Sequence, residues 1–192
     1  MVLVVPICAV ALVVGWLRGG RLANLGHVTL RSSWMVLVGF AAQLLLAWLT
    51  ARADRAGVAG LPLLVLSQVA LLGFLWRNRL LTGMPLVLAG FLLNAVVIVA
   101  NGAMPVAPAA LEAVSGRPAA LVPGKHRLLG ADDALPWLAD VLPIPLLRTV
   151  VSVGDVVLAA GVGVLVVDLM RHRPPGTRRR SPSRSARPTV RG

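Results

Sequence analysis

Five apolar segments constrain the fold of this chain more than any other feature of its sequence. They are residues 2–17, 34–50, 61–76, 84–100 and 149–170. A helix needs roughly 17–25 apolar residues to cross a bilayer core about 30 Å thick. The chain is also 57% hydrophobic, against about 45–50% in soluble domains. We therefore predict an all-α, polytopic integral membrane protein with five transmembrane helices and no separate soluble core.

The distribution of charge predicts how this protein faces the membrane. If the C-terminus is cytoplasmic, segments 18–33, 77–83 and 171–192 lie inside and hold thirteen arginines and no acidic residue. Segments 51–60 and 101–148 then lie outside, with six basic and five acidic residues. An excess of positive charge in cytoplasmic loops is typical of membrane proteins. The pattern predicts an N-terminus outside and a C-terminus inside.

Four polar side chains lie within the predicted spans, namely Gln43, Gln68, Asn94 and Asp155. Counted from the outer helix ends at 1.5 Å per residue, each lies roughly 10 Å below the outer boundary. The three amides either form hydrogen bonds between helices or line a small cavity open to the outside. The acid is more demanding, because a carboxylate at the centre of a span costs about 2.5–3.5 kcal/mol. It must be protonated, hydrated or paired, and pairing with Arg148 is the structural alternative to a functional role.

Small and polar residues recur on one face of each of the last two spans. In the final span this face is formed by Arg148, Ser152, Asp155, Ala159 and Gly163, at spacings of three and four. In the span before it, Gly90, Asn94 and Asn101 are aligned. Small residues allow helices to approach closely in a membrane. We therefore predict that these two faces pack against each other beneath segment 101–148.

Segment 101–148 is predicted to form an extracytoplasmic cap. The sequence NGAMPVAP at its start ends the preceding helix, because Asn101 and Gly102 tolerate left-handed backbone and the prolines prevent continuation. The sequence ADDALPWLADVL is compatible with a short amphipathic helix on the membrane, capped by Asp132 or Asp133. His126 and these two acids match no metal-ligand spacing. We predict neither a metal nor another cofactor.

Three short motifs together resemble a known family. They are NGAMPV after a span, LADVLPIP in the loop, and SVGDVVLAAG at the start of the last span. The combination is similar to bacterial multi-pass membrane proteins catalogued as domain of unknown function 5317, over most of residues 1–170. The resemblance implies a bacterial cytoplasmic membrane protein with signature positions at Asn101, Gly102, Met104, Pro105 and residues 152–155. It implies no activity.

We predict a non-enzymatic membrane module that binds a ligand, lipid or partner protein in an outward-facing polar pocket between the fourth and fifth spans, 84–100 and 149–170. Asp155 would supply charge, Asn94 and Asn101 hydrogen bonds, and the turn with Met104 and Pro105 the rim. Arg148 and Ser152 belong to the same cluster, and His126, Asp132 and Asp133 are candidate contributors from the loop. One alternative is a membrane enzyme for a lipid-linked substrate, with Asp155 as general base and His126 or an acidic loop residue assisting. Another is a small proton-coupled transporter in which Asp155 titrates.

The basic tail, residues 171–192, is low in complexity and is predicted to be disordered. It carries eight arginines, which suit either RNA or the anionic headgroups of the bilayer. It has no aromatic residue to stack on bases. The favoured reading is therefore a topology determinant that lies along anionic lipid, without specific nucleic-acid binding.

Overall fold

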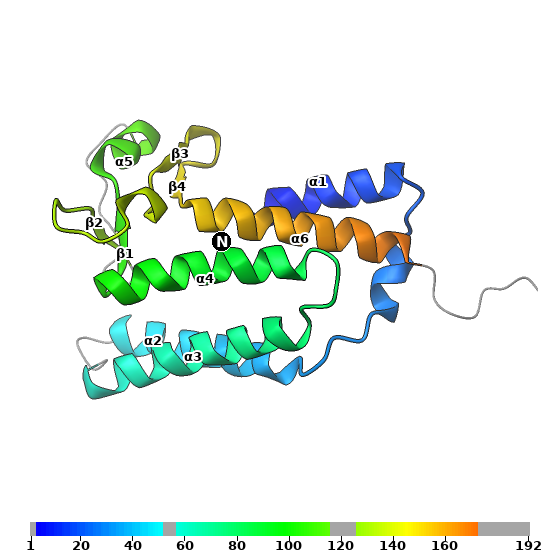
Figure 1. The fold of residues 1–192 in the computed structure, drawn as a ribbon, viewed down its shortest axis with the longest axis horizontal. Helices are drawn as coiled ribbons and strands as arrows, with labels where there is room; N and C mark the ends of the chain where they lie inside the picture. Colours follow the sequence, from blue (N-terminus) through cyan, green and yellow to red (C-terminus); the bar gives the residue numbers. More distant parts are fainter. Residues whose placement is uncertain (1–2, 52–56, 116–125, 173–192) are drawn as a thin grey trace, which may run out of the picture.

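The computed structural model describes residues 3–51, 57–115 and 126–172, which fold into a mostly helical protein (Figure 1). The α-helices are α1 (Val4–Leu17), α2 (Trp34–Ala51), α3 (Gly57–Arg77), α4 (Met84–Asn101), α5 (Pro108–Ser115) and α6 (Val153–Arg171). The short 3-10 helices are η1 (Leu22–His27), η2 (Pro136–Leu138) and η3 (Pro145–Leu147). The strands are β1 (Met104–Val106), β2 (His126–Leu128), β3 (Leu142–Ile144) and β4 (Thr149–Val151).

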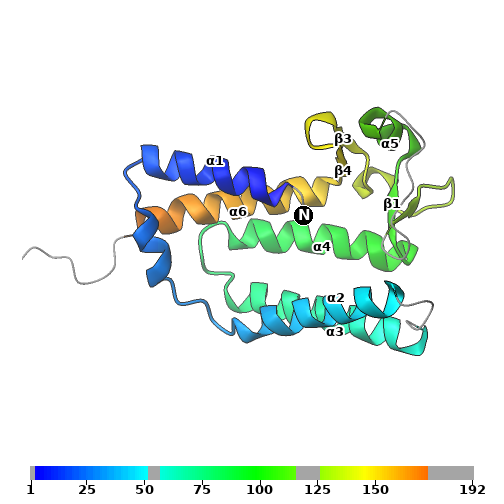
Figure 2. The same ribbon diagram turned by 180° about the vertical axis from the view of Figure 1, so that it is seen from behind.

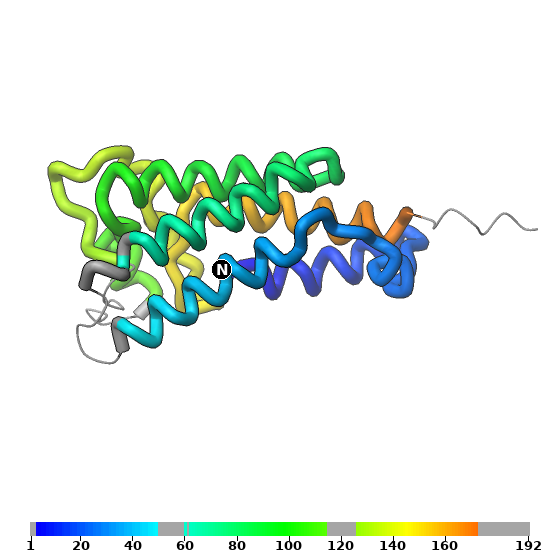
Figure 3. Tube along the Cα trace, turned by 90° about the horizontal axis from the view of Figure 1, so that it is seen from below, coloured from blue at the N-terminus to red at the C-terminus, as the bar shows by residue number. Residues whose placement is uncertain are grey.

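Helices α1, α2, α3, α4 and α6 run roughly along one common axis (Figure 3). The strands and α5 gather at one end of this bundle, and η1 lies at the other with the last turn of α6 (Figures 1 and 2). Within the described residues, α4 and α6 are the helices both long and apolar enough to cross a membrane. The apolar stretches of α1, α2 and α3 are shorter, at Val4–Leu17, Trp34–Leu49 and Pro62–Arg77.

Glycines bring α4 and α6 into close antiparallel contact. A Cβ added at Gly83 would lie 2.5 Å from the carbonyl oxygen of Gly161. Two turns further along α4, a Cβ added at Gly154 of α6 would lie 2.8 Å from the carbonyl oxygen of Gly90. Any side chain at these positions would therefore force the helices apart. The same seven-residue spacing on both helices keeps the backbones together over two turns.

The predicted close packing of the last two spans is thus present, but Gly163, a predicted member of the face, is not part of it. Gly163 turns toward α1, where an added Cβ would lie 3.1 Å from Cγ2 of Ile7. Gly154 and Gly161 take the positions against α4 instead. The reason is the 100° step of a helix, which turns residue 163 away from a face centred on residues 154 and 161.

Helix α1 packs along the second half of α6. The fully buried Met170 side chain fits against Gly15 and Gly20, where an added Cβ would lie 2.5 Å from Sδ and 2.8 Å from Cβ of Met170. The Met170 carbonyl accepts hydrogen bonds from Nδ2 of Asn24 at 2.6 Å and the Arg21 N–H at 2.9 Å. These contacts fix the end of α6 against the connection that follows α1.

Helices α2 and α3 form an antiparallel hairpin. Gly39 packs against Leu71, Gly73 against Met35, and Gln43 donates a hydrogen bond to the buried Ser67 at 3.4 Å. The hairpin joins α4 and α6 through an apolar core at the end away from the cap. Its buried members are Leu75, Met84, Val87 and Leu88, with Phe74, Leu158 and Leu165 among the side chains around them.

Helix boundaries follow local sequence rules at most ends. Helix α4 starts after Gly83 and ends at Gly102, both with left-handed backbone (φ 85° and 75°), and Pro85 lies in its first turn. Helix α3 differs from the prediction, because it begins at Gly57 and so places Pro62 inside the helix. Proline there removes one backbone donor.

The cap covers the ends of α4 and α6 and contains β-structure, which the all-α prediction did not include. Strand β1 pairs in parallel with β2, and β3 pairs antiparallel with β4. The Asp140 N–H donates to the Pro105 carbonyl, and the Ala107 N–H donates to the Asp140 carbonyl, both at 2.9 Å. Strand β1 therefore lies between two neighbours, which explains why its three residues are all buried.

Candidate functional site

Three side chains form a closed set of hydrogen bonds where α6 begins beside α4. Ser152 Oγ donates to Asn94 Oδ1 at 2.8 Å, and Asn94 Nδ2 donates to Asp155 Oδ1 at 2.8 Å. The backbone N–H of Asp155 completes the set by donating to Ser152 Oγ at 3.0 Å. We call Asn94, Ser152 and Asp155 the polar ring. It joins the two helices through their side chains.

The position of α6 explains why a carboxylate stands in so apolar a stretch. The helix begins at Val153, with Ser152 as its N-cap, so Asp155 lies in the first turn. Negative charge is stabilised there by the unpaired N–H groups and the helix dipole. The predicted start at residue 149 is wrong, because Thr149–Val151 form a strand against Leu142–Ile144. Asp155 is therefore at a helix end and not seven residues inside a span.

Arg148 does not take part in the polar ring. It follows η3 with left-handed backbone (φ 47°), and its side chain is exposed in the cap. Among the residues that the structure describes, no ion pair joins it to Asp155. The predicted pairing of Arg148 with Asp155 assumed that both lie on one helix. It fails because strand β4 lies between Arg148 and the start of α6. Asp155 is half-buried, and its Oδ2 accepts no hydrogen bond from a described residue.

Asn101, at the end of α4, fastens the cap to the helix. Its Oδ1 accepts the Ala134 N–H and its Nδ2 donates to the Ala134 carbonyl, both at 2.9 Å. The same Nδ2 also donates to the Val97 carbonyl at 2.9 Å. Both ends of this amide are occupied within the protein, so Asn101 holds the loop in place.

Met104 and Pro105 lie in β1 and are buried inside the cap. Pro105 pairs with Arg127 in the β1–β2 register, and Met104 pairs with His126. The His126 ring contacts the buried Asp140, with 3.4 Å between Nδ1 and Oδ2. The predicted rim residues are thus the interior of the cap, and His126 faces Asp140.

An ion pair closes the loop that follows β2. Arg127 Nη1 donates to Asp133 Oδ2 at 3.0 Å, and Nη2 contacts Oδ1. The Gly130 N–H donates to Asp133 Oδ2 at 2.8 Å. The Arg127 guanidinium, and after it this backbone N–H, hold the pKa of Asp133 below its ordinary 3.8. Because the ionised form is the one with partners, the pair stabilises the loop at neutral pH.

We predicted that Asp132 or Asp133 caps an amphipathic helix. This prediction is wrong, because Asp133 instead closes a turn. That helix is absent from the described cap, where residues 131–141 contain turns, the three-residue η2 and a single bridge at Asp140. The residue at the N-cap position of η2 is Leu135, which has left-handed backbone and no polar side chain to cap a helix. Pro136 and the pairing of Asp140 with β1 exclude a longer helix. Asp132 is exposed.

The remaining polar residues predicted at the same depth are not part of the ring. Gln43 is bonded to Ser67 in the α2–α3 hairpin. Gln68 is half-buried on α3 and forms no hydrogen bond with the ring in the described structure. No group of three metal-ligating side chains is found among the described residues.

Sequence reasoning missed three residues that organise the structure. Asp140 lies within the LADVLPIP motif but was not singled out, and Arg127 was not paired with Asp133. Asn78 is buried where α3 ends. Its Nδ2 donates to the carbonyls of Arg31 and Phe74, and its Oδ1 accepts the Arg31 N–H at 2.9 Å. An Asn directly after an apolar helix was the available signal for this last contact.

The fold and the ring define a mostly helical protein with two membrane-capable helices joined side by side under a small cap. Residues 27–167 match the model of a family described as a family of unknown function, DUF5317. The chain therefore belongs to this family, in agreement with the resemblance of its motifs. The matched range contains the polar ring and the whole cap. No curated protein matches the chain, and no solved structure matches it.

Proposed function

We propose that this protein crosses a bacterial cytoplasmic membrane through α1, α2, α3, α4 and α6 and acts there as a non-enzymatic binding module. The observation that carries the membrane placement is the exposure of α4 and α6. Each is apolar enough to cross a membrane, yet only 22% of its apolar window is buried. A core helix of a soluble protein would be mostly buried, and a signal sequence would lie near the N-terminus. Neither description fits these helices, whereas lipid would cover their apolar surfaces.

The five tryptophans support the same placement. Each has more than half of its surface exposed, and each lies near a helix end or in the cap: Trp16, Trp34, Trp48, Trp76 and Trp137. Tryptophan is enriched where a membrane meets water, because one part of the ring is apolar and the N–H is polar. Two belts of tryptophan, one at each end of the bundle, fit a layer of lipid between them.

Charge supports an orientation with the cap outside. The end away from the cap carries Arg18, Arg21, Arg31, Arg77, Arg79 and Arg171 among its described residues. Asp168 is the acidic residue described near them. This asymmetry favours a cytoplasmic location for that end. Helix α1 has 14 residues, about 21 Å at 1.5 Å per residue, so the bilayer would thin or deform locally around it.

The polar ring is the basis of the proposed binding role. Asn94 holds Oδ1 of Asp155, while Oδ2 has no partner among the described residues and the side chain is half-exposed. The exposed Val156 follows it directly on α6. A fixed carboxylate oxygen at the junction of cap and bilayer suits a cationic or hydrogen-bond-donating group on a lipid, a small ligand or a partner protein. Asn94, Ser152 and Asn101 would then orient this site, because their polar atoms are bonded within the protein.

Accessibility of single cysteines tests the membrane placement. Cys8 is first replaced by serine, and one cysteine is introduced at Leu146, which is 92% exposed in the cap. A second variant carries its cysteine at Gly26 in η1, where an added Cβ has no neighbour within 4 Å. A membrane-impermeant maleimide should label intact cells at position 146, and should label position 26 only after permeabilisation. Labelling of both positions only after permeabilisation would contradict the topology, as would the reverse pattern.

Co-purification from native membranes tests the binding role. Asp155→Asn keeps the shape and the acceptor for Asn94 but removes the charge. Asp132→Asn, an exposed acid in the cap, is the matched control. We expect a lipid or protein retained by the wild type and the control to be lost from Asp155→Asn at unchanged protein level. Equal retention by all three proteins would contradict a binding role for Asp155.

A further inference from the structure

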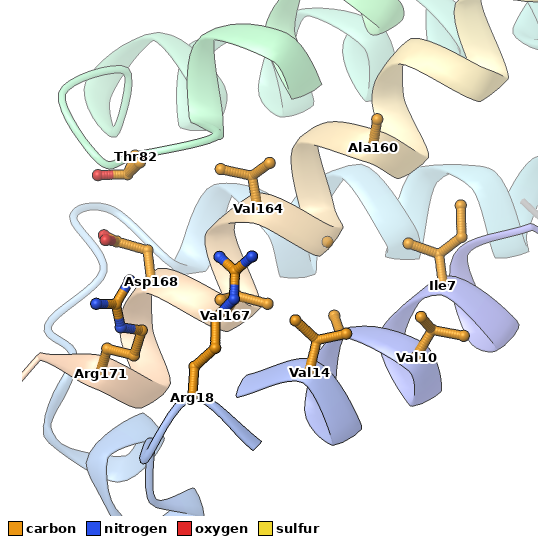
Figure 4. A pocket seen from close by; sticks show the side chains of 12 residues that line it. Ile7, Val10, Val14, Arg18, Thr82, Ala160, Val164, Val167, Asp168 and Arg171 are labelled. Carbon is orange, nitrogen blue, oxygen red and sulfur yellow. The ribbon is translucent and has the colours of Figure 1, made fainter. Parts of the chain in front are cut away.

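A cavity whose lining does not include the polar ring lies between α1 and the second half of α6 and reaches the end away from the cap. Its volume is about 440 Å³, within the range of about 300–1,000 Å³ for small-molecule sites. Apolar side chains from both helices form its walls, with Val10 and Val14 on α1 and Val164 and Val167 on α6 (Figure 4). Gly163 forms part of the lining and lets α1 approach. The cavity is therefore an elongated apolar trough between two parallel helices.

One end of this trough is charged. Arg18 directly follows α1, Arg171 is the last residue of α6, and Asp168 lies one turn before Arg171. Figure 4 shows the Arg18 side chain extending over the trough beside Val167, with Arg171 on the other side of the mouth. Neither guanidinium forms an ion pair with a residue that the structure describes. Asp168 contacts His172, with 3.4 Å between Oδ2 and Nδ1.

We propose that this trough binds one anionic glycerophospholipid. An acyl chain would lie along the valines, and the headgroup phosphate would be held by Arg18 and Arg171. Guanidinium groups bind phosphate oxygens in pairs of hydrogen bonds. Asp168 would accept a hydrogen bond from a headgroup hydroxyl, which favours a phosphoglycerol group over a bare phosphate. The inference depends on the membrane placement proposed above, since it puts the two arginines at the level of the cytoplasmic headgroups.

The charge pattern distinguishes this site from general coverage by lipid. An apolar surface alone would take any acyl chain without regard to the headgroup. Here two unpaired cations, from different helices, meet at the mouth of one apolar cavity. A phospholipid with a negative headgroup matches both parts of the site, whereas a zwitterionic headgroup would leave net positive charge at the mouth.

Native mass spectrometry of the full-length protein tests this proposal. The protein is released from nanodiscs that hold equal amounts of phosphatidylglycerol and phosphatidylcholine with matched acyl chains, and the retained lipids are counted. We expect one phosphatidylglycerol to be retained in preference to phosphatidylcholine. The preference should fall about fivefold in Arg18→Gln and about fivefold in Arg171→Gln. Each arginine near an anionic membrane surface contributes about 1 kcal/mol, which corresponds to a factor of about five in binding.

Two further variants make the test specific. Arg21→Gln combined with Arg31→Gln removes two positive charges, as many as Arg18→Gln and Arg171→Gln together, from exposed residues at the same end but outside the cavity. This control should keep the preference. Val164→Trp, at a partly exposed position, should fill the trough and lower retention of both lipids. No preference in the wild type, or an equal loss in the Arg21/Arg31 variant, would overturn the proposal. Either result, with the cysteine labelling as expected, would leave the membrane placement intact.

Discussion

Asn94 on α4 donates a hydrogen bond to Asp155 on α6 at 2.8 Å, although 61 positions separate them in the chain. Ser152 binds the other end of the same amide and caps α6. A carboxylate that would be costly in the middle of a span therefore stabilises the start of a helix and its contact with the neighbouring helix. The predictions below follow from this arrangement and from the cap above it.

Ser152→Ala should destabilise the protein by about 1–3 kcal/mol. It removes the N-cap of α6, which contributes about 0.5–2 kcal/mol, and a buried donor to Asn94. The free energy of unfolding in mixed micelles measures the effect. Thr149→Ala is the control, because its hydroxyl has a single long contact of 3.4 Å with the next carbonyl. It should change stability by less than about 0.5 kcal/mol, and an equal effect of both changes would contradict the role of Ser152.

Gly154→Ala should separate α4 from α6 and lower stability by about 1–3 kcal/mol, as overpacking of a tight interface does. The added methyl group would meet the Asn94 side chain and the Gly90 carbonyl. Gly26→Ala, where an added Cβ meets nothing within 4 Å, is the matched control. Thermal unfolding in detergent compares the two. A Gly154→Ala protein as stable as Gly26→Ala would show that the helices do not pack this closely.

The long helices could be predicted from the sequence, since apolar segments 2–17, 34–50 and 84–100 differ from α1, α2 and α4 by at most two residues at each end. Segment 61–76 begins four residues after the start of α3, which continues through Pro62. The contact between α4 and α6 could also be predicted, from Gly90 and Asn94 on one helix and Asp155 on the other, although Gly154 and Gly161 were not part of that prediction. These features are local or periodic, and a linear pattern reports them.

The start of α6 and the inside of the cap could not be predicted in the same way. A valine-rich run such as residues 149–153 suits a strand as well as a helix, and its pairing with β3 decides between them. The bonds of Asn101 to Ala134 and of His126 to Asp140 depend on how the loop folds back. Nothing in residue spacing indicates those partners. Met104 and Pro105, predicted at the rim of the pocket, are also buried because the loop folds back over β1.

Asn101→Ala should loosen the cap while leaving the helices in place. The change removes both hydrogen bonds that hold Ala134 at the end of α4. Hydrogen exchange read by mass spectrometry should show faster exchange in the loop around residue 134, by about thirtyfold for two lost bonds of about 1 kcal/mol each. Exchange in α6 should stay unchanged. Unaltered exchange in the loop would mean that Asn101 does not fasten the cap.

Acid should release the loop held by Asp133. Its pKa lies below the ordinary 3.8 because Arg127 and the Gly130 N–H favour the ionised form. The stabilisation is therefore complete above about pH 4 and is lost as the pH falls through the lowered, folded-state pKa. Susceptibility of the loop to pepsin between about pH 4 and pH 2, corrected for the intrinsic activity of the protease, should rise in the wild type.

Asp133→Asn serves as the comparison for this acid effect. The variant should already be cleaved faster at about pH 4, and its susceptibility should change little on further acidification. Asp132→Asn should behave as the wild type, because Asp132 is exposed and outside the Arg127 pair. A wild-type profile without a rise would contradict the lowered pKa.

A double-mutant cycle on Asn94 and Asp155 tests most directly whether these two side chains join α4 to α6. The free energy of unfolding is measured for the wild type, Asn94→Ala, Asp155→Ala and the double variant. We predict a coupling energy of about 1–2 kcal/mol, as expected for a half-buried hydrogen bond to a carboxylate. Single changes that add within about 0.3 kcal/mol would contradict the contact between the two helices.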